Sequence, residues 1–214
     1  PKETIMEHTN KLLENLKVLK NIYSKDIEQN KDFVNERFWY LLEIICRYHD
    51  IGKVYTPFQN IIRQKLGEEI IETEFSYEKV KHEQLSPMFV PVEKLGLTED
   101  EKVLVYQAIY YHHERENKEI SKEYIRRIIE KDVYPNIDKI KQELKIDIRE
   151  KIDEKYIKRV GDRITEHHHL YKKIYPEYCM LKGLLHRLDH SSSAEIAVEN
   201  ENGQVIEKCT KEFM

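Results

Sequence analysis

Apolar residues recur at intervals of three or four positions along most of the chain, which is the spacing of one face of an α-helix. Near the N-terminus, Ile5, Leu12 and Leu16 follow this spacing after Thr4, a residue type that caps helix N-termini. The stretch "FWYLLEIICRY" lies within a second, more continuously apolar segment that extends from 33 to 48. The chain is therefore predicted to begin with an amphipathic helix followed by a mostly buried one.

Turn and cap residues divide the part of the chain that follows. The stretch "TPFQNIIRQKLG" predicts a short helix with Thr56 as N-cap, Pro57 at the first helical position and Gly67 at its end. Thr98 and Glu101 have the spacing of a capping box, which predicts the start of a helix that runs toward the histidines at 112 and 113. Two segments lie between these helices. The polar residues 68–81 are expected to form a loop, and "HEQLSPMFVPVEKLG", with its two prolines, predicts a short broken helix.

The C-terminal half is also predicted to be helical. From 118 to 170, apolar residues spaced by three or four in a strongly charged background predict two or three amphipathic helices, interrupted near Pro135 and near Asp147. "YPEYCMLKGLLHRLD" predicts another buried helix, and "ENENGQV" is either a turn between two short strands or a loose tail. We predict an all-α helical bundle over residues 1–190 and a segment over 191–214 that is either a tail or packed on the core.

Composition supports a helical protein and narrows its class. The chain has 214 residues with only 6 Gly and 6 Pro, so turns are scarce, and 40% hydrophobic residues are enough for a core. The formal net charge of −4 excludes a nucleic-acid binder held by overall charge alone, although metal cations or a local basic patch would supply the attraction. Three cysteines without paired spacing predict a reducing, cytoplasmic location, and no apolar run approaches the ~20 residues of a membrane span.

Histidines and aspartates in five separate segments suggest a dispersed metal site. The candidate ligands are His8, His49, Asp50, His82, His112, His113 and Asp189. Neutral imidazoles and carboxylates in such numbers suit divalent first-row transition metals. The carboxylate of an adjacent His-Asp pair is able to bridge two ions, and two ions about 3.5–4 Å apart clamp a phosphate and lower the pKa of a bridging water. Lys53, one helical turn after Asp50, would neutralise charge that develops on a phosphate oxygen.

A structural role for the histidines is the competing interpretation. Any single histidine on an apolar face is more often a satisfied core residue than a ligand, so the argument rests on the set. The run at 167–169 is predicted to be a solvated face, because three consecutive helical residues point in three directions. If all the histidines have only a structural role, the chain would be a non-catalytic helical scaffold.

The ordered motifs resemble the HD metal-dependent phosphohydrolase superfamily, and within it the HD nuclease of type I CRISPR-associated interference. The resemblance rests on "HTNKLLENL", "YHDIGKVYTPFQ", "KHEQLSP", "IYYHHERE" and "LLHRLDHSSSA". It spans the chain from His8 into the serines that follow Asp189. The dipeptide "HD" alone is a weak signal, whereas its order with "HExxS" and "HH" is much more specific.

The resemblance implies an all-α HD domain with a central site for one or two divalent ions (Mn, Ni, Co or Fe, with Mg as a further candidate) that cuts single-stranded DNA. It assigns one ion to His8, His49, Asp50 and Asp189, and the second to Asp50, His82, His112 and His113. Asp50 and Lys53 would be the catalytic residues, with one of Ser191, Ser192 or Ser193 at the edge of the site. The implied partners are a separate helicase and the guide-RNA surveillance complex, whose displaced DNA strand would be the substrate.

Two departures from the family pattern matter. The chain has no G-x-x-x-x-G-K-[ST] phosphate loop, so it would be a stand-alone nuclease subunit or a piece of a longer protein. Glu114 follows the histidine pair where a small residue is more usual, which would narrow the entrance or add an outer carboxylate. An HD phosphohydrolase that acts on small nucleotides or cyclic nucleotides, with the same metal chemistry and a more closed pocket, is the alternative enzyme.

Overall fold

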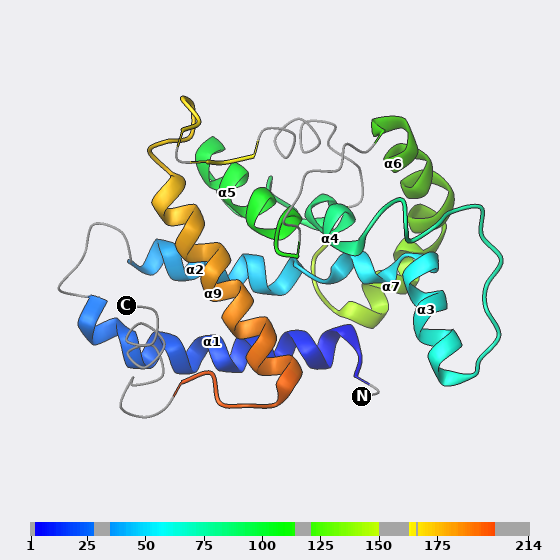
Figure 1. Cartoon of the computed structure of the whole chain (residues 1–214), viewed down its shortest axis with the longest axis horizontal. Coiled ribbons are helices and arrows are strands. Elements are labelled where there is room, and N and C mark those ends of the chain that lie inside the picture. The colour runs from blue at the N-terminus through cyan, green and yellow to red at the C-terminus, as the bar shows by residue number, and fades with distance from the viewer. Residues whose placement is uncertain (1–2, 28–34, 114–120, 150–162, 166, 200–214) are drawn as a thin grey trace.

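The structure is a computed structural model that describes residues 3–27, 35–113, 121–149, 163–165 and 167–199 (Figure 1). Its α-helices are α1 (Ile5–Ile27), α2 (Glu36–Tyr48), α3 (Thr56–Leu66), α4 (His82–Leu85), α5 (Glu99–Tyr110), α6 (Lys122–Ile128), α7 (Ile137–Leu144) and α9 (Tyr175–Ala194). The 3-10 helices η1 (Ile51–Val54), η2 (Ser86–Phe89) and η4 (Tyr134–Asn136), and the π-helical turn η3 (Ile129–Val133), connect them. Because the described residues contain helices and no strand, the predicted all-α class is confirmed.

Helix α2 lies at the centre of the bundle. It packs against α1, α5 and α9, and α9 in turn contacts both α1 and α5. In Figure 1, α9 crosses over α1 and α2. Leu12, Leu42, Ile45 and Leu185, which come from three of these helices, are all fully buried. The four helices therefore share one core, and the apolar spacing of the sequence marks the faces that form it.

Two predicted helix starts are confirmed in atomic detail. The Thr4 hydroxyl accepts a hydrogen bond from the backbone N–H of Glu7 at 3.1 Å, immediately before α1. At the start of α5, the Thr98 hydroxyl accepts from the Glu101 N–H at 3.3 Å, and the Glu101 carboxylate accepts from the Thr98 N–H at 2.7 Å. These bonds satisfy backbone donors that have no partner within the helix.

The predicted start of α3 is wrong by one residue. Thr56 is already helical, and the N-cap is Tyr55, whose backbone is extended. The Thr56 N–H donates to the Asp132 carboxylate at 2.8 Å, so a side chain distant in sequence satisfies this donor. The helix ends as predicted at Gly67, which adopts the left-handed conformation with φ 71° that glycine tolerates without strain.

The start of α2 is set by Asn35, whose side chain accepts hydrogen bonds from the backbone N–H groups of Arg37 and Phe38. The sequence pattern placed this helix from Phe33 onward, and Phe33 lies outside the described residues. The described helix begins at Glu36 and continues through Tyr48, as predicted.

The segment from 121 to 149 forms the predicted interrupted helices beside this core. The interruption near Pro135 is the 3-10 helix η4 between η3 and α7. The chain then returns to the bundle, where the Arg149 N–H donates to the Phe89 carbonyl at 2.9 Å. The helix expected beyond this point falls partly on residues 150–162, which lie outside the described residues. The prediction is wrong for 163–165 and 167–170, which are described and form turns and irregular structure instead of a helix.

Helix α9 is longer than the sequence pattern indicated. It continues through Ala194, so the predicted boundary between 190 and 191 falls inside a helix. Ser192 is buried there, and its hydroxyl accepts a hydrogen bond from Asn15 of α1 at 3.0 Å. The Ser192 side chain thus connects the extended end of α9 to α1. The "ENENGQV" stretch lies outside the described residues beyond Glu199.

None of the helices in the described ranges combines the length and the apolar character needed to cross a membrane.

Candidate metal centre

All seven predicted ligands converge on one place in the bundle. His8 lies in α1, His49 and Asp50 follow α2, His82 begins α4, the pair at 112 and 113 follows α5, and Asp189 lies in α9. They form two groups of four that share Asp50. We call His8, His49, Asp50 and Asp189 the closed group, since all four are buried, and Asp50, His82, His112 and His113 the open group, since His113 is exposed. Within each group the candidate ligand atoms lie within 4.8 Å of one another, and either group could hold a metal ion.

Asp50 divides its two carboxylate oxygens between the groups. Oδ2 lies 3.5 Å from Nε2 of His49 and 3.7 Å from Nε2 of His8, on the closed side. Oδ1 lies 3.2 Å from Nε2 of His82 and 3.9 Å from Nε2 of His112, on the open side. This is the arrangement that a carboxylate needs to bridge two cations.

The backbone around Asp50 is shaped by a close approach to the His82 segment. A Cβ atom on Gly52 would lie 2.0 Å from the His82 carbonyl oxygen, which is too short for any side chain. Ser86 joins the two segments, because its hydroxyl accepts from the Gly52 N–H at 2.8 Å and donates to the His82 carbonyl at 3.0 Å. The glycine of "HDIGK" and the serine of "HEQLS" therefore set the distance between two ligands.

Backbone carbonyls fix the tautomers of the His49 and His112 imidazoles. Nδ1 of His49 lies 2.9 Å from the Cys46 carbonyl, and Nδ1 of His112 lies 2.6 Å from the Ile109 carbonyl. A carbonyl oxygen only accepts, so each Nδ1 carries the hydrogen and each neutral ring presents a lone pair at Nε2. Both lone pairs are directed toward the Asp50 carboxylate.

His82 is oriented by side chains instead. Its Nδ1 lies 3.3 Å from the Tyr77 hydroxyl and 3.2 Å from Oε2 of the buried Glu83. With its hydrogen on Nδ1, beside the Tyr77 hydroxyl and the Glu83 carboxylate, the His82 ring would turn the Nε2 lone pair toward Oδ1 of Asp50. Tyr77 and Glu83 were not among the predicted site residues. The only sequence signal for a role of Glu83 was its position next to His82 in "HEQLS". No sequence spacing pointed to Tyr77.

Four buried polar atoms of this site lack hydrogen-bond partners, and a cation would satisfy them. Nε2 of His49, Nε2 of His82, Nε2 of His112 and Oδ1 of Asp50 are all buried without a hydrogen bond. Unpartnered buried polar atoms are costly and rare, and here several electron pairs face a common centre. The donor set, which consists of imidazole nitrogens and carboxylate oxygens, is the one that divalent transition metals prefer. The residues present therefore fit metal ions in both groups.

The closed group contains the only direct hydrogen bond between predicted ligands among the described residues. Nε2 of His8 lies 2.9 Å from Oδ1 of Asp189. The same Asp189 oxygen lies 3.8 Å from Nε2 of His49, too far for a hydrogen bond. Glu3, which the sequence did not indicate, lies 3.7 Å from Nδ1 of His8. In the closed group, the carboxylates of Asp50 and Asp189 thus lie close to the imidazoles of His8 and His49 in a buried space.

Electrostatics keep the carboxylates ionised. Burial alone would raise the pKa of Asp50 and of Asp189, but the neighbouring histidines outweigh it and hold both pKa values well below the usual range. Burial would likewise lower the pKa of His49, but the charges of Asp50 and Asp189 outweigh the burial and raise that pKa. His49 therefore attracts a positive charge, either a proton or a metal ion, at Nε2.

In the open group, the pKa values of two histidines are lowered, in contrast to that of His49. Burial and the neighbouring rings of His49 and His113 hold the pKa of His112 well below its usual range. Burial and the charge of His82 lower the pKa of His113 to about 4. Both imidazoles are consequently neutral at neutral pH, which is the protonation state that binds a metal.

Lys53 lies at the site, but it contacts a carboxylate. Its ammonium forms an ion pair with Oδ2 of Asp50 and lies 5.7 Å from the centre of the Phe58 ring. The Gln59 side-chain amide donates to the Lys53 carbonyl at 2.6 Å and fixes its backbone. The predicted contact of Lys53 with a phosphate stays a prediction. It requires the ammonium either to move away from the Asp50 carboxylate or to contact the carboxylate and the phosphate together.

Other histidines and serines lie outside the two groups. His167 and His169 are exposed, and His168 stacks on Tyr171 with the ring centres 4.6 Å apart. Of the three serines, Ser191 and Ser192 are buried and Ser193 is exposed. Glu114, which was expected to narrow the entrance, lies outside the described residues.

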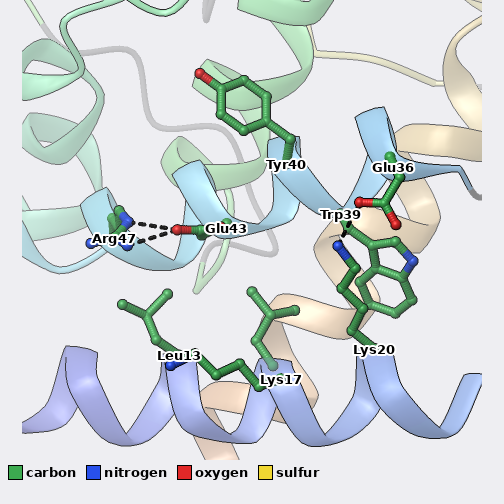
Figure 2. A pocket seen from close by; sticks show the side chains of 9 residues that line it. Leu13, Lys17, Lys20, Glu36, Trp39, Tyr40, Glu43 and Arg47 are labelled. Atoms are coloured by element: carbon green, nitrogen blue, oxygen red, sulfur yellow. Dashed lines mark hydrogen bonds and ion pairs between the residues drawn. The ribbon is translucent and has the colours of Figure 1, made fainter. Parts of the chain in front are cut away.

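A separate cavity of about 340 Å³ lies between α1 and α2 and includes none of the predicted ligands (Figure 2). Leu13 and Trp39 form part of its apolar wall. Two basic groups at its rim are neutralised by acids of α2, because Lys20 pairs with Glu36 at 2.6 Å and Arg47 pairs with Glu43 at 2.7 Å. The groups suited to metal chemistry therefore lie at the His/Asp cluster and not in this cavity.

Comparison with known proteins gives no match: no family model, no curated protein and no solved structure matches this chain. The functional argument consequently rests on the residues of the metal centre and on the sequence motifs.

Proposed function

We propose that this protein is a metal-dependent nuclease that hydrolyses phosphodiester bonds of single-stranded DNA. The observation that carries the proposal is the pair of four-residue groups that share Asp50, with unpartnered imidazole nitrogens directed at its carboxylate. A pair of carboxylate-bridged sites is the arrangement that enzymes use for displacement at phosphorus.

The ligand chemistry favours Mn, Ni, Co or Fe, with Mg as the poorer fit because it prefers oxygen ligands. Such ions, when bound, would supply Lewis acidity that lowers the pKa of water and neutralises charge on a phosphate. The chain's own contribution is to hold the ligands in position. Backbone carbonyls orient His49 and His112, and Glu83 with Tyr77 orients His82.

The proposed substrate approaches on the side of the open group. His113 is its exposed member, whereas every member of the closed group is buried. Lys53 is one-quarter exposed and lies beside Asp50, where its ammonium would meet a phosphate oxygen. A flexible single strand reaches such a recessed site more easily than a stiff duplex does.

The proposed setting, CRISPR interference, rests on the sequence motifs. In that setting a separate helicase and a guide-RNA surveillance complex would present the strand that is displaced when the guide pairs with its target. The nuclease itself would then need little electrostatic affinity of its own for nucleic acid, in agreement with its net charge of −4.

The test is incubation of untagged protein with circular single-stranded DNA and either Mn²⁺ or Ni²⁺. We expect nicking that a chelator stops, and Asp50→Ala is expected to reduce the rate at least about 1000-fold, equivalent to about 4 kcal/mol of transition-state stabilisation. The matched control is Asp147→Ala, which removes an exposed carboxylate that pairs with Lys94. Intact circles together with rapid turnover of a mononucleotide or cyclic nucleotide would instead assign the protein to small-molecule phosphohydrolysis.

A further inference from the structure

A second lysine lies beside the open group, and neither the ligand set nor the predicted catalytic pair includes it. Lys81 immediately precedes His82, and its ammonium lies 4.2 Å from the centre of the Tyr77 ring. The hydroxyl of the same tyrosine lies 3.3 Å from Nδ1 of His82. Lys81 is therefore connected to a predicted metal ligand through one aromatic side chain.

Among the described residues, no acid neutralises the charge on Lys81. Lys53 pairs with Asp50, but no carboxylate in the described part of the chain forms an ion pair with the Lys81 ammonium. Its side chain is only partly exposed, so a positive charge is held in a defined place at the edge of the site. A cation in van der Waals contact with an aromatic face is attracted by the ring and has lost part of its hydration.

Tyr77 is a stable platform for this cation. Phe58 packs edge-to-face on it with ring centres 5.4 Å apart. Because Phe58 also contacts the His82 ring at 5.3 Å, the position of Lys81 is coupled to that of the ligand.

We propose that Lys81, held on the face of Tyr77, binds a phosphate that neighbours the scissile one in a nucleic-acid chain. This inference rests on the proposed nuclease function and gives it a substrate class: an oligonucleotide, whose flanking phosphates are part of the binding energy. A mononucleotide or an isolated phosphodiester has no second phosphate for this lysine.

The chain offers a closely matched control. Lys79, two residues earlier, also places its ammonium over a tyrosine ring, that of Tyr124 at 5.5 Å. Tyr124 lies in α6 and packs on Phe75, and neither contacts a predicted ligand. Lys79→Gln therefore removes the same charge and the same type of contact without altering the surroundings of His82.

The first arm of the test measures binding without chemistry. Wild type, Lys81→Gln and Lys79→Gln are titrated into a fluorescein-labelled oligothymidylate in chelator, over a series of salt concentrations. We expect Lys81→Gln to weaken binding several-fold and to reduce the slope of log affinity against log salt by about 0.7, the value for one lost contact with a single strand. Lys79→Gln retains the wild-type slope, and Lys81→Arg restores it.

The second arm compares two substrates of the metal-loaded protein: the oligonucleotide and bis(4-nitrophenyl) phosphate, which contains one phosphodiester and no flanking phosphate. We expect the loss of kcat/KM in Lys81→Gln to be at least fivefold greater for the oligonucleotide. Equal losses on both substrates, or a salt slope equal to that of Lys79→Gln, would overturn the inference. Absence of cleavage by wild type would refute the proposed nuclease, whereas the binding arm decides the role of Lys81 in either case.

Discussion

The closed and open groups share Asp50, yet they differ in composition and in exposure. The closed group combines two carboxylates with two imidazoles, and all its members are buried. The open group combines one carboxylate with three imidazoles, and His113 faces solvent. Two anionic ligands in a buried space favour tight retention of a divalent ion, whereas a group with one anionic ligand and an exposed member favours exchange and access. We therefore expect the closed group to bind its ion more tightly and the open group to meet the substrate.

The largest expected difference comes from removal of one imidazole on each side. His49→Ala removes the buried imidazole that lies near both the Asp50 and the Asp189 carboxylates, which costs the metal-free fold about 3 kcal/mol. His113→Ala changes an exposed residue, so its effect on folding is expected to be within about 0.5 kcal/mol. Denaturant unfolding in chelator measures both.

The metal affinities provide the second half of this comparison. His113→Ala is expected to lower the affinity of the weaker ion at least about 100-fold while the tighter ion is retained. Outer contacts alone are worth about 10–100-fold, and a direct ligand contributes no less. Retention of the weaker ion by His113→Ala, or loss of the tighter one, would remove the distinction between the groups.

A smaller effect is expected from the side chain that orients His82. Glu83→Gln removes the carboxylate 3.2 Å from Nδ1 of His82 and should weaken the open-group ion by about 10-fold. Glu83 contacts a ligand of the open group, so the affinity of the closed-group ion should not change. Glu69→Gln, at an exposed glutamate, serves as the control. Competition titration with a chromogenic chelator distinguishes a selective loss from a general one, and a general loss would contradict the assignment.

The smallest effect concerns pH. The pKa of His113 is lowered to about 4 in the folded chain, whereas an unfolded histidine titrates near 6.5. The unfolded state therefore binds this proton first, and the metal-free protein loses stability as the pH falls from about 6.5 to about 4. Solvent screening at this exposed residue limits the effect to about 1 kcal/mol.

The closed group contributes with the opposite sign and in a higher pH range, above about pH 6.5. The pKa of His49 is raised in the fold, so its protonation stabilises the metal-free protein fully below about pH 6.5 and progressively less above it. Unfolding experiments at pH 8, 6.5 and 4.5 should show a shallower decline below pH 6.5 in His113→Asn than in wild type. A variant that lacks the His49 imidazole should lose the gain in stability that His49 protonation gives as the pH falls toward 6.5. The same pH dependence in all three proteins would show that the two groups do not differ in this way.

Local signals predicted the parts of the fold that short-range interactions determine. The Thr4 cap, the Thr98–Glu101 capping box and the Gly67 terminus depend on neighbours within a few residues, and all three are confirmed. The N-cap of α3 was misplaced because Asp132, a residue distant in sequence, takes the Thr56 N–H. The extent of α9 was underestimated since the partner of Ser192 lies on α1.

In the candidate site too, the sequence predicted the residues but not the long-range contacts that position them. Residue type and order identified the residues that converge, since imidazoles and carboxylates in separate apolar segments are recognisable in a sequence. Sequence order did not reveal how they are held. The Gly52–Ser86 contact, the carbonyls that orient His49 and His112, and the placement of Tyr77 depend on distances across the bundle that no spacing encodes.

The most direct test of the shared site is calorimetric titration of untagged, metal-free protein with Mn²⁺ or Ni²⁺. The geometry predicts two bound ions per chain with different affinities, and Asp50→Asn is expected to weaken both because each group uses one of its oxygens. Wild-type protein that binds no ion, or an Asp50→Asn variant that still binds two ions with unchanged affinity, would contradict the account.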